Sequence, residues 1–384
     1  MTDVLFYVQH LLGIGHLRRA ALIAKAMDRA GLGVVLVSGG QPVPGLDVGG
    51  AALVQLPPLR ARDDRFSELV DGAGKPVGAA WKAARAARLL EIYDQSRPKV
   101  LLIEMFPFGR RLMRFELLPL LEAAQASRPR PQILCSLRDV LGAARSAEKV
   151  EWMLTTFHRF FDQLLVHGDP AFLPLQHSFP RAGEIAAKTR YTGYVVEDVH
   201  KGEAKAGSSG EVVISAGGGA VAGPLIAAAL AARPLSPLAS VPWRILVGNN
   251  LPEDAFQAAR GAAPAGVMVE RARADFTALL ARARLSISQG GYNTILEVLA
   301  ARIPAVVVPF AGSGETEQNV RATALGDRGA ITVLTEAQLS PAALAAAIQR
   351  ALSAAPQPTD LRLDLGGMEK TAQIVGQAAA IVTP

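Results

Sequence analysis

Cysteine is almost absent from this chain, and Cys135 is the only one. An intrachain disulfide is therefore impossible, and because Cys135 lies in an apolar run we expect a buried, inert thiol. Aromatic residues make up only 5 %, and basic residues outnumber acidic ones by 40 to 34, a net charge of +6. These values argue against a nucleic-acid partner, since no aromatic-basic interleaving accompanies the small excess of charge. They suit an anionic substrate or an anionic lipid surface.

Signals for metals, export and membrane spans are also missing. The sequence has no Asp-x-Asp motif and no His/Cys cluster with metal-ligand spacing, so we expect neither a metal nor another cofactor. The apolar run Val4–Val8 begins without a basic segment before it, which predicts no secretory signal and a cytoplasmic protein. The uncharged stretch Val212–Ala232 is long enough to span a bilayer, but glycines and a proline interrupt it. We interpret it as strand, loop and helix.

The length and the hydrophobic content suit two domains. Of the 384 residues half are hydrophobic, enough for two buried cores. Short apolar runs alternate with Ala-, Leu- and Arg-rich stretches, the pattern of parallel strands connected by helices. The predicted strands are Val4–Val8, Gly33–Ser38, Val100–Glu104, Gln132–Ser136, Leu164–His167, Val212–Ser215, Trp243–Val247, Leu285–Ser288 and Ala305–Pro309. The predicted helices include Arg18–Ala30, Glu148–Phe161 and Met368–Ile381.

A polar and then glycine- and serine-rich segment near the middle is the best candidate for a linker. We therefore predict an α/β protein with two doubly wound, Rossmann-like domains that face each other across a cleft. Ligands of such sheets bind beyond the carboxyl ends of the strands. The predicted boundaries are 1–195 for the N-terminal domain, 196–210 for the linker, 211–366 for the C-terminal domain and 367–384 for a helix that packs back on the N-terminal domain.

The first motif is Gly13-Ile14-Gly15-His16, between the first strand and the first helix. Two glycines allow a tight turn and the close approach of a substrate, and a helix N-terminus favours negative charge. An imidazole at this place is suited to accept a proton near neutral pH, although a structural turn with a helix-capping histidine has the same pattern. Arg18 stands where a dinucleotide fingerprint needs its third glycine, which disfavours a nicotinamide dehydrogenase.

The second motif is the glycine run Gly217, Gly218 and Gly219, which follows the first strand of the second half. Consecutive glycines expose backbone amides that suit an anion such as a diphosphate, and an unliganded turn is the alternative. The Lys-Ser/Thr pair of a P-loop is missing, so an NTPase is disfavoured.

The third and most informative motif is Gln289–Glu297, followed by Glu317 and Gln318 after the next strand. Gly290 and Gly291 turn the chain, and a helix begins near Asn293, where Asn293 and Thr294 are expected to cap it and to present amides to phosphate. Glu297 lies one helical turn further on the same face. A carboxylate at that place can accept two hydrogen bonds from the vicinal hydroxyls of a ribose.

This third segment resembles the donor-binding signature of the GT-B nucleotide-sugar glycosyltransferases over about thirty residues. It is similar to the C-terminal domain of the peptidoglycan N-acetylglucosaminyltransferases that make lipid II (MurG-like). It also resembles the box of natural-product glycosyltransferases, which has the pattern H-x-G-W-N-S-x-L-E and ends in D/E-Q. The chain departs from these patterns in two ways: uncharged Gln289 replaces the box histidine, and no tryptophan that could stack on uracil lies near Val269–Arg271.

The resemblance implies a set of donor-binding residues. Glu297 would bind the ribose, Asn293 and Thr294 the diphosphate, Glu317 and Gln318 the sugar hydroxyls, and the backbone near Arg271 the uracil. The full set that we predict on the donor side is Gly217, Gly218, Gly219, Arg271, Gln289, Gly290, Gly291, Asn293, Thr294, Glu297, Glu317 and Gln318.

The acceptor side is expected in the N-terminal half, at Gly13, Gly15, Glu104, Arg138 and Asp139. The last three follow apolar strands, so we place them at the rim of the cleft. Two stretches in which basic and apolar residues mix, Trp81–Arg88 and Phe106–Phe115, predict either solvated helix faces or a peripheral contact with anionic lipid.

Together these features predict an inverting, metal-independent glycosyltransferase that moves a sugar from a nucleoside diphosphate sugar, most simply a UDP-sugar, to a hydroxyl of a glycan, lipid or small molecule. His16 is the expected general base. Three alternatives stay open: a nucleotide-sugar hydrolase that uses the same Gly-x-Gly-His turn, a nucleotide-sugar 2-epimerase, and a non-catalytic subunit that binds nucleotide sugar. The sequence has no motif that identifies the acceptor.

Overall fold

The computed structural model describes residues 2–63, 68–142, 146–197, 210–216, 223–248, 251–273, 275–310, 316–354 and 362–382. The chain forms two compact units. Unit 1 contains Met1–Val195 together with Leu363–Pro384, and unit 2 contains Val196–Arg362. Of the expected linker 196–210, residues 198–209 lie outside the described part.

Unit 1 is built on a parallel sheet with the order β3-β2-β1-β6-β7-β8-β9, seven strands within the described residues. A short antiparallel pair, β4 and β5, forms a separate two-stranded sheet in this unit. The strands are β1 Val4–Val8, β2 Val34–Ser38, β3 Ala52–Gln55, β4 Leu59–Ala61, β5 Leu69–Asp71, β6 Val100–Glu104, β7 Gln132–Arg138, β8 Gln163–His167 and β9 Thr189–Tyr191. The helices are α1 Gly15–Arg29, α2 Ala79–Ser96, α3 Arg114–Ala126, α4 Ala147–Phe160 and α11 Gly367–Ile381.

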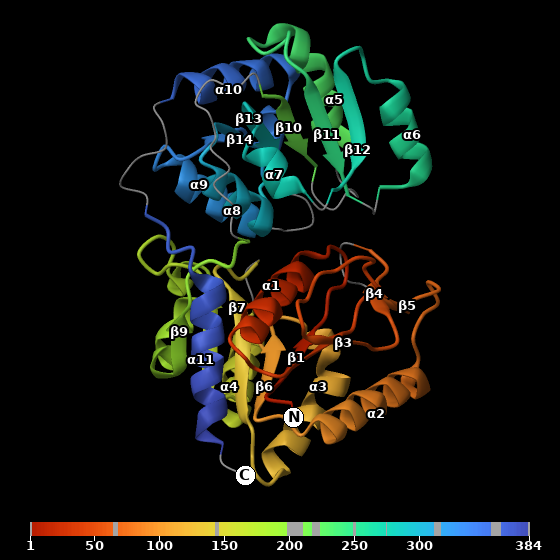
Figure 1. Ribbon diagram of the computed structural model, residues 1–384, viewed down its shortest axis with the longest axis vertical. Coiled ribbons are helices and arrows are strands. Elements are labelled where there is room, and N and C mark those ends of the chain that lie inside the picture. Colours follow the sequence, from red (N-terminus) through yellow and green to blue (C-terminus); the bar gives the residue numbers. More distant parts are fainter. Residues whose placement is uncertain are drawn as a thin grey trace. The chain divides into compact units, whose positions relative to one another are not determined.

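Strand β1 is buried on both faces, which is why it has no polar residue. Successive side chains of a strand point to opposite faces, so Val4, Phe6 and Val8 pack with α1 and α11. Leu5 and Tyr7 pack with α2, α3 and α4 on the other face (Figure 1). This two-sided burial explains the continuous apolar runs that the sequence shows at its parallel strands.

The order in which strands are added to this sheet reverses between β1 and β6, which are parallel neighbours. One series of strands runs outward from β1 through β2 to β3, and the other runs from β6 through β7 and β8 to β9. Such a switch point opens a crevice beyond the carboxyl ends of its two central strands, where ligands of doubly wound sheets bind. The segments that follow β1 and β6 are therefore the place to look for a site in unit 1.

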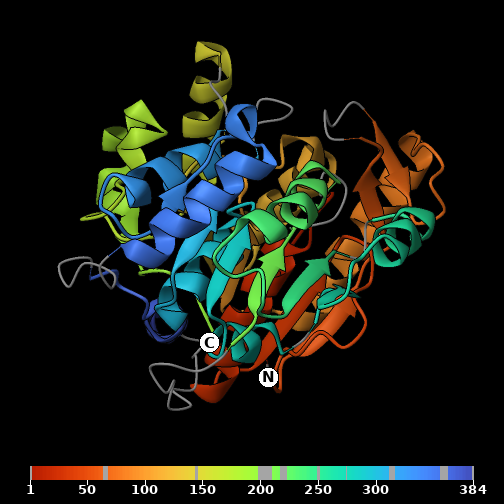
Figure 2. The ribbon, with the colours of Figure 1, turned by 90° about the horizontal axis from the view of Figure 1, so that it is seen from above.

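Unit 2 has a second parallel sheet with the order β12-β11-β10-β13-β14-β15, six strands within the described residues, and its switch point lies between β10 and β13. Seen from above (Figure 2), α5 and α10 lie side by side on one face, where both contribute to one hydrophobic core. The strands are β10 Val212–Ser215, β11 Trp243–Val247, β12 Val267–Arg271, β13 Leu285–Ser288, β14 Ala305–Val307 and β15 Thr332–Val333. The helices are α5 Gly223–Ala232, α6 Glu253–Gly261, α7 Phe276–Leu280, α8 Tyr292–Ala301, α9 Glu317–Gly326 and α10 Pro341–Ser353.

The predicted α/β class is confirmed, and each predicted strand has a counterpart with ends that agree within two residues. The strands that the sequence did not predict are short or lie toward the edge of a sheet. Edge strand β12 illustrates the reason: its residues alternate between buried Val269 and half-buried or exposed neighbours such as Met268, so it lacks a continuous apolar run. Helix α1 begins at Gly15, three residues before the predicted start.

The last helix belongs to unit 1 although the chain has passed through unit 2 before it. Helix α11 packs on α1, and Met368, Ala372 and Val375 are buried in the same core as the α1 side chains. A bridge between Val195 and Gly366 joins the segment before α11 to the segment that leaves unit 1. Among the residues that the structure describes, no helix is long and apolar enough to cross a bilayer.

Candidate functional site

His16 is the second residue of α1, directly after the exposed loop that follows β1. Its side chain is 13 % exposed, and the residue before the helix, Ile14, makes no side-chain capping bond. Neither Gly13 nor Gly15 has a positive φ, and a side chain at Gly13 would meet nothing within 4 Å. The backbone of this turn therefore does not need the conformational freedom of glycine, and the close approach of a substrate stays a prediction.

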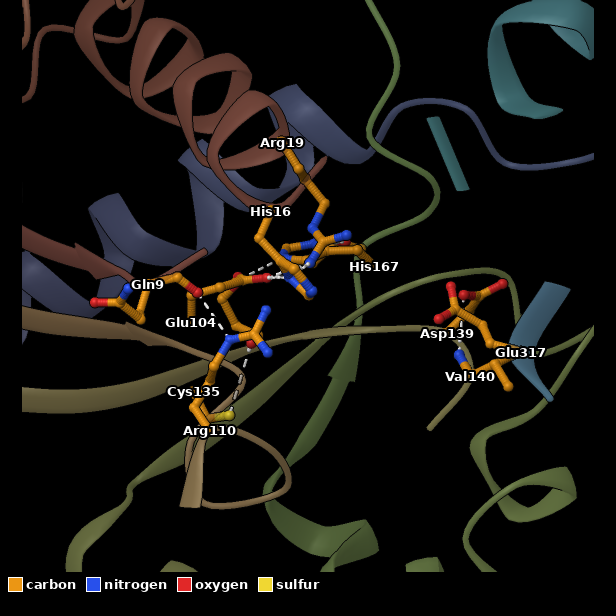
Figure 3. Close-up of polar contacts among 12 residues, drawn as sticks. Gln9, His16, Arg19, Glu104, Arg110, Cys135, Asp139, Val140, His167 and Glu317 are labelled. Carbon is orange, nitrogen blue, oxygen red and sulfur yellow. Dashed lines mark hydrogen bonds and ion pairs between the residues drawn. The ribbon is translucent and has the colours of Figure 1, made fainter. Parts of the chain in front are cut away.

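Glu104 is the partner of His16. It ends β6, the strand next to β1, and one of its oxygens, Oε1, lies 2.9 Å from His16 Nδ1. Figure 3 shows both side chains pointing toward each other. We expected Glu104 at the rim of the cleft, but within unit 1 the residue is fully buried, because β6 is a central strand covered on both faces.

Three further side chains, which the sequence did not single out, surround this pair. Arg19, one turn after His16 on α1, donates to Glu104 Oε1. Ser136 of β7 donates to Glu104 Oε2, and its Oγ lies 2.9 Å from Nε2 of His167, the last residue of β8. All of them are buried. The sequence could have indicated this cluster in one way: Glu104, Ser136 and His167 lie at or near the carboxyl ends of consecutive parallel strands, which meet at one edge of the sheet.

The charges of this cluster determine its protonation. Burial and the positive charge of Arg110 lower the pKa of His16 well below its usual value, against the opposing effect of Glu104. Burial favours the neutral form of Glu104, yet Arg19 and His16 outweigh it and hold the pKa of this carboxyl well below its usual value. His16 is thus neutral and Glu104 ionised near pH 7. Because carboxylate oxygens only accept hydrogen bonds, the contact with Glu104 puts the proton on His16 Nδ1, and Nε2 keeps the lone pair. Arg19 Nη2, which lies 3.2 Å from the same Nδ1, then donates to Glu104.

Arg138 and Asp139 stand at and just after the end of β7. Asp139 is not at a rim as expected. It is 1 % exposed and accepts hydrogen bonds from the hydroxyl of Tyr194 at 3.1 Å and from the backbone of Val140 at 2.9 Å. Arg138 is half-buried, and its charge contributes, with burial, to lowering the pKa of Arg110 to about 10.

In the two predicted basic-apolar patches, Trp81–Arg88 and Phe106–Phe115, most of the apolar side chains are buried in the core or half-buried. Phe106 and Phe108 are fully buried because they pack with α4 and its neighbours. Arg85 is buried as well and forms an ion pair with Glu116 at 2.7 Å. The residues of the two patches that are exposed include Arg88, Leu112 and Arg114.

In unit 2 the predicted donor segment follows β13 at the switch point of the sheet. Gly290 has φ +80°, and a Cβ there would lie 2.6 Å from Val307 Cγ1, so this position needs glycine. Helix α8 then begins at Tyr292, with Gly291 as its N-cap. The expected capping by Asn293 and Thr294 is wrong, because both lie inside the first turn and no side-chain capping bond is present.

The start of α8 is nevertheless suited to an anion. The first intrahelical bond joins the Ile295 amide to the Gly291 carbonyl, so the amides before Ile295 have no acceptor within the helix. Glu297 is 7 % exposed and lies one turn beyond Asn293. Gln289 is also buried, and its backbone N–H donates to the Ser215 carbonyl at the end of β10, at 3.4 Å.

Glu317 and Gln318 begin α9. Glu317 is buried and pairs with Arg321 at 2.8 Å, and the Arg321 guanidinium lies over the ring of Tyr292 at 5.1 Å. Arg321, which the sequence did not single out, therefore connects the first turn of α9 to the first turn of α8. Gln318 Oε1 accepts a hydrogen bond from the Phe310 backbone amide at 3.1 Å, which connects the start of α9 to the segment that follows β14.

Arg271 ends β12 and is engaged within unit 2. Its guanidinium donates to the carbonyls of Gly248 and Leu251 and pairs with Glu253 at 2.6 Å. It also lies over the ring of Phe256 at 4.3 Å. Through these contacts Arg271 connects the end of β12 to Gly248 and Leu251, which follow β11.

Two predictions concern residues or groups of which less can be said. Gly217, Gly218 and Gly219 lie outside the described residues. Within the described ranges, no group of three or more His, Cys, Asp or Glu side chains is placed to hold a metal ion.

Comparison with known proteins adds to this geometry. Residues 212–364 match the glycosyltransferase family 28 C-terminal domain. A UDP-N-acetylglucosamine--N-acetylmuramyl-(pentapeptide) pyrophosphoryl-undecaprenol N-acetylglucosamine transferase of Natranaerobius thermophilus is 39 % identical over 66 residues, which are 17 % of this chain and 18 % of that protein. The chain thus matches about a fifth of that relative's length.

Solved structures match over nearly the whole chain. The calicheamicin glycosyltransferase CalG4 has a TM-score of 0.59 at 16 % identity, over 99 % of this chain and 96 % of its own. MurG of Acinetobacter baumannii has a TM-score of 0.57 at 16 % identity, over 100 % and 99 %. Residues 212–364 are therefore a glycosyltransferase family 28 C-terminal domain, and the chain as a whole has the GT-B glycosyltransferase fold.

Proposed function

We propose that this chain is a glycosyltransferase that moves a sugar from a nucleoside diphosphate sugar, bound by unit 2, to a hydroxyl group of an acceptor, with His16 of unit 1 as the general base. One observation carries the proposal: the imidazole of His16 lies 2.9 Å from the buried carboxylate of Glu104 at the switch point of the unit 1 sheet. The family 28 domain at residues 212–364 supports the donor half.

His16 Nε2 takes the acceptor proton while the acceptor oxygen attacks the anomeric carbon. The new carbon–oxygen bond forms as the bond to the diphosphate breaks, and the nucleoside diphosphate leaves with the electron pair. Attack from the face opposite the leaving group inverts the anomeric centre. Glu104 accepts a hydrogen bond from Nδ1–H of His16, which keeps its proton, and stabilises the imidazolium that forms, a role worth about 10²–10⁴-fold together with the base.

The donor residues stay those that the motif predicts. The amides at the start of α8, with Gly217–Gly219, would hold the diphosphate and stabilise its growing charge without a metal. Glu297 would accept hydrogen bonds from the ribose hydroxyls, and Gln318 would contact the sugar. Since the relatives' names contain UDP-N-acetylglucosamine, a UDP-N-acetylhexosamine is the first donor to test.

A thermal-shift panel of UDP-glucose, UDP-N-acetylglucosamine and a thymidine diphosphate sugar tests the donor half. A ligand at 100 times its Kd stabilises the native protein by about 2.7 kcal/mol. We expect a shift with one UDP-sugar that Glu297→Ala abolishes. The matched variant Glu336→Ala, on a half-buried residue of the same unit, should keep the shift. If no nucleotide sugar stabilises the protein, the donor assignment is wrong.

His16→Ala tests the catalytic half. We expect turnover to fall by about 10²–10⁴-fold while the donor-induced thermal shift is kept. Release of free sugar from the donor without an acceptor would instead identify a hydrolase, because the same base can activate water. Unchanged turnover in His16→Ala would remove His16 from the chemistry.

We also propose that the protein works at the cytoplasmic face of a membrane. Exposed Arg88, Leu112 and Arg114 support a peripheral contact with anionic lipid. Co-sedimentation with phosphatidylglycerol vesicles should weaken in Arg88→Glu/Arg114→Glu, and binding that neither charge reversal nor added salt reduces would contradict the proposal.

A further inference from the structure

Glu104 is one end of a longer row of hydrogen-bonded side chains along the carboxyl edge of the unit 1 sheet. Beyond Ser136, His167 continues the row, and its Nδ1 lies 2.8 Å from the hydroxyl of Thr192. Ser136, His167 and Thr192 are buried to 0 % exposure. They come from β7, from β8 and from the segment after β9, so the row crosses three neighbouring strands.

The number of protons available gives the row a direction. Ser136 has one hydroxyl proton and two neighbours that could accept it, Glu104 Oε2 and His167 Nε2. An ionised carboxylate cannot donate, and hydrogen bonds to charged acceptors are the stronger ones, so the proton points to Glu104. Ser136 Oγ must then accept, which requires a proton on His167 Nε2.

The other ring nitrogen follows from the charge of His167. Burial and the positive charge of Arg19 lower the pKa of His167 to about 3, so the ring is neutral at working pH. With its proton on Nε2, Nδ1 has a lone pair and accepts the hydroxyl proton of Thr192. The carbonyls of Gly193 and Val166, at 2.9 and 3.4 Å from Thr192 Oγ1, compete for the same proton.

The opposite tautomer is disfavoured on the same grounds. A proton on Nδ1 would put the lone pair of Nε2 against a lone pair of Ser136 Oγ at 2.9 Å, unless Ser136 turned away from Glu104. That turn would remove a hydrogen bond from a buried carboxylate, which costs more than the loss of a neutral bond.

We propose that Thr192, His167 and Ser136 form a one-way hydrogen-bond chain that fixes the orientation of Glu104 and thereby holds His16 in the tautomer with Nε2 available. They are positioning residues, and only their effect on turnover rests on the proposed function. This hydrogen-bond chain requires two different tautomers of two neutral histidines: the Nε2–H form of His167 and the Nδ1–H form of His16.

Long-range ¹H–¹⁵N correlation spectra of the full chain labelled with ¹⁵N-histidine test this directly. Signals of the six histidines are assigned by single replacements. At pH 7 we expect the Nε2–H form at His167 and the Nδ1–H form at His16. An Nδ1–H form at His167, or a protonated ring there, overturns the proposal whether or not the protein transfers sugar.

Thr192→Val and Thr192→Ser form the matched pair of variants. Valine keeps the shape but removes the proton that His167 Nδ1 accepts, and serine keeps it. We expect Thr192→Val to disturb the tautomer of His167 and to lower kcat about 3- to 10-fold, with the donor KM unchanged. Thr192→Ser should keep the tautomer of His167 and the kcat of the unsubstituted protein. Equal behaviour of the two variants would contradict the proposed hydrogen-bond chain.

Ser136→Ala tests the link to Glu104. Without the Ser136 proton the carboxylate attracts the His16 proton more strongly, so the pKa of His16 should rise, observed by NMR titration and as an upward shift of the acid limb of kcat. The charged groups that face His16 are Arg19 of α1, Arg110 after β6, Arg138 of β7 and Glu104 itself. Because all of them remain in Ser136→Ala, an unchanged His16 titration would overturn the proposal. Absence of transfer in the unsubstituted protein, with the expected tautomers, would count against the proposed function alone.

Discussion

The carboxylate of Glu104 is shielded from water and balanced by three donors from two elements, His16 and Arg19 of α1 and Ser136 of β7. A buried charge is tolerated only where such partners compensate its lost hydration. At the residue scale, the chemistry of unit 1 therefore depends on the charge of Glu104 as much as on the imidazole that it holds.

Glu104→Gln keeps the size of the side chain and removes this charge. We expect turnover to fall by about 10²-fold or more, because the imidazolium loses its counter-charge. The matched control is Glu116→Gln, since Glu116 is equally buried and pairs with Arg85 and Tyr7. Steady-state rates per folded molecule should separate them: the control loses stability but keeps kcat. Equal losses of kcat would refute a specific role for Glu104.

The buried histidines predict acid sensitivity. Burial and Arg110 lower the pKa of His10 to about 4, and the pKa values of His16 and His167 are also below the ordinary 6.5. Between these values and 6.5 the unfolded state binds more protons, so the free energy of unfolding falls as the pH falls through this window. Each histidine contributes at most about 1.4 kcal/mol per pH unit. Glu104, whose pKa is lowered too, adds a further loss below its unfolded value of about 4.5.

Urea unfolding at pH 5, 6, 7 and 8, monitored by hydrogen exchange of unit 1 peptides, measures this slope. His10→Gln should reduce the number of protons taken up on unfolding, which this slope measures, by up to one. His177→Gln, at an exposed position, should leave it unchanged. A free energy of unfolding that does not change between pH 5 and 8 would contradict the linkage.

At the scale of elements, the start of α8 depends on one backbone conformation. Gly290→Ala places a side chain at φ +80° and against Val307. The backbone alone should cost about 1–2 kcal/mol, and the shift of the helix start should weaken nucleotide-sugar binding. Gly261→Ala is the matched control, because Gly261 lies in the same unit, has no positive φ and has an open surrounding. Its cost should be below about 1 kcal/mol. Calorimetric titration with the stabilising nucleotide sugar compares them, and equal affinities would refute the role of this turn.

At the scale of the whole molecule, the two units differ in how the chain builds them. Unit 2 is one continuous segment, whereas unit 1 needs the helix that follows unit 2. Buried Val375 of α11 lies in the core that α1 and β1 share. The stability of unit 1 therefore depends on residues at the far end of the chain.

Val375→Asp should destabilise unit 1 by more than about 3 kcal/mol, because it places an unpaired charge in an apolar core. Hydrogen exchange should show lost protection in α1 and retained protection in β10 and β13. Gln377→Asp, exposed on the same helix, is the control. Loss of protection in both units would show that they unfold as one.

Much of this protein was readable from local patterns. The strands that are buried on both faces have continuous apolar runs, so they were predicted with nearly correct bounds. The donor segment and His16 could be predicted as site residues because the residue types of each motif are neighbours in the sequence. Capping at Asn293 was misjudged because helix propensities leave the start uncertain by a residue or two, and Gly291 took the N-cap.

The surroundings of His16 depended on the tertiary structure. Arg19, Glu104, Ser136, His167 and Thr192 belong to separate segments, and no spacing rule connects them. They meet because parallel strands bring their carboxyl ends to one edge, where burial makes each polar side chain find a partner. The sequence by itself thus determined the class of fold and the imidazole, and the packing of the sheet decided which carboxylate holds it and which proton it carries.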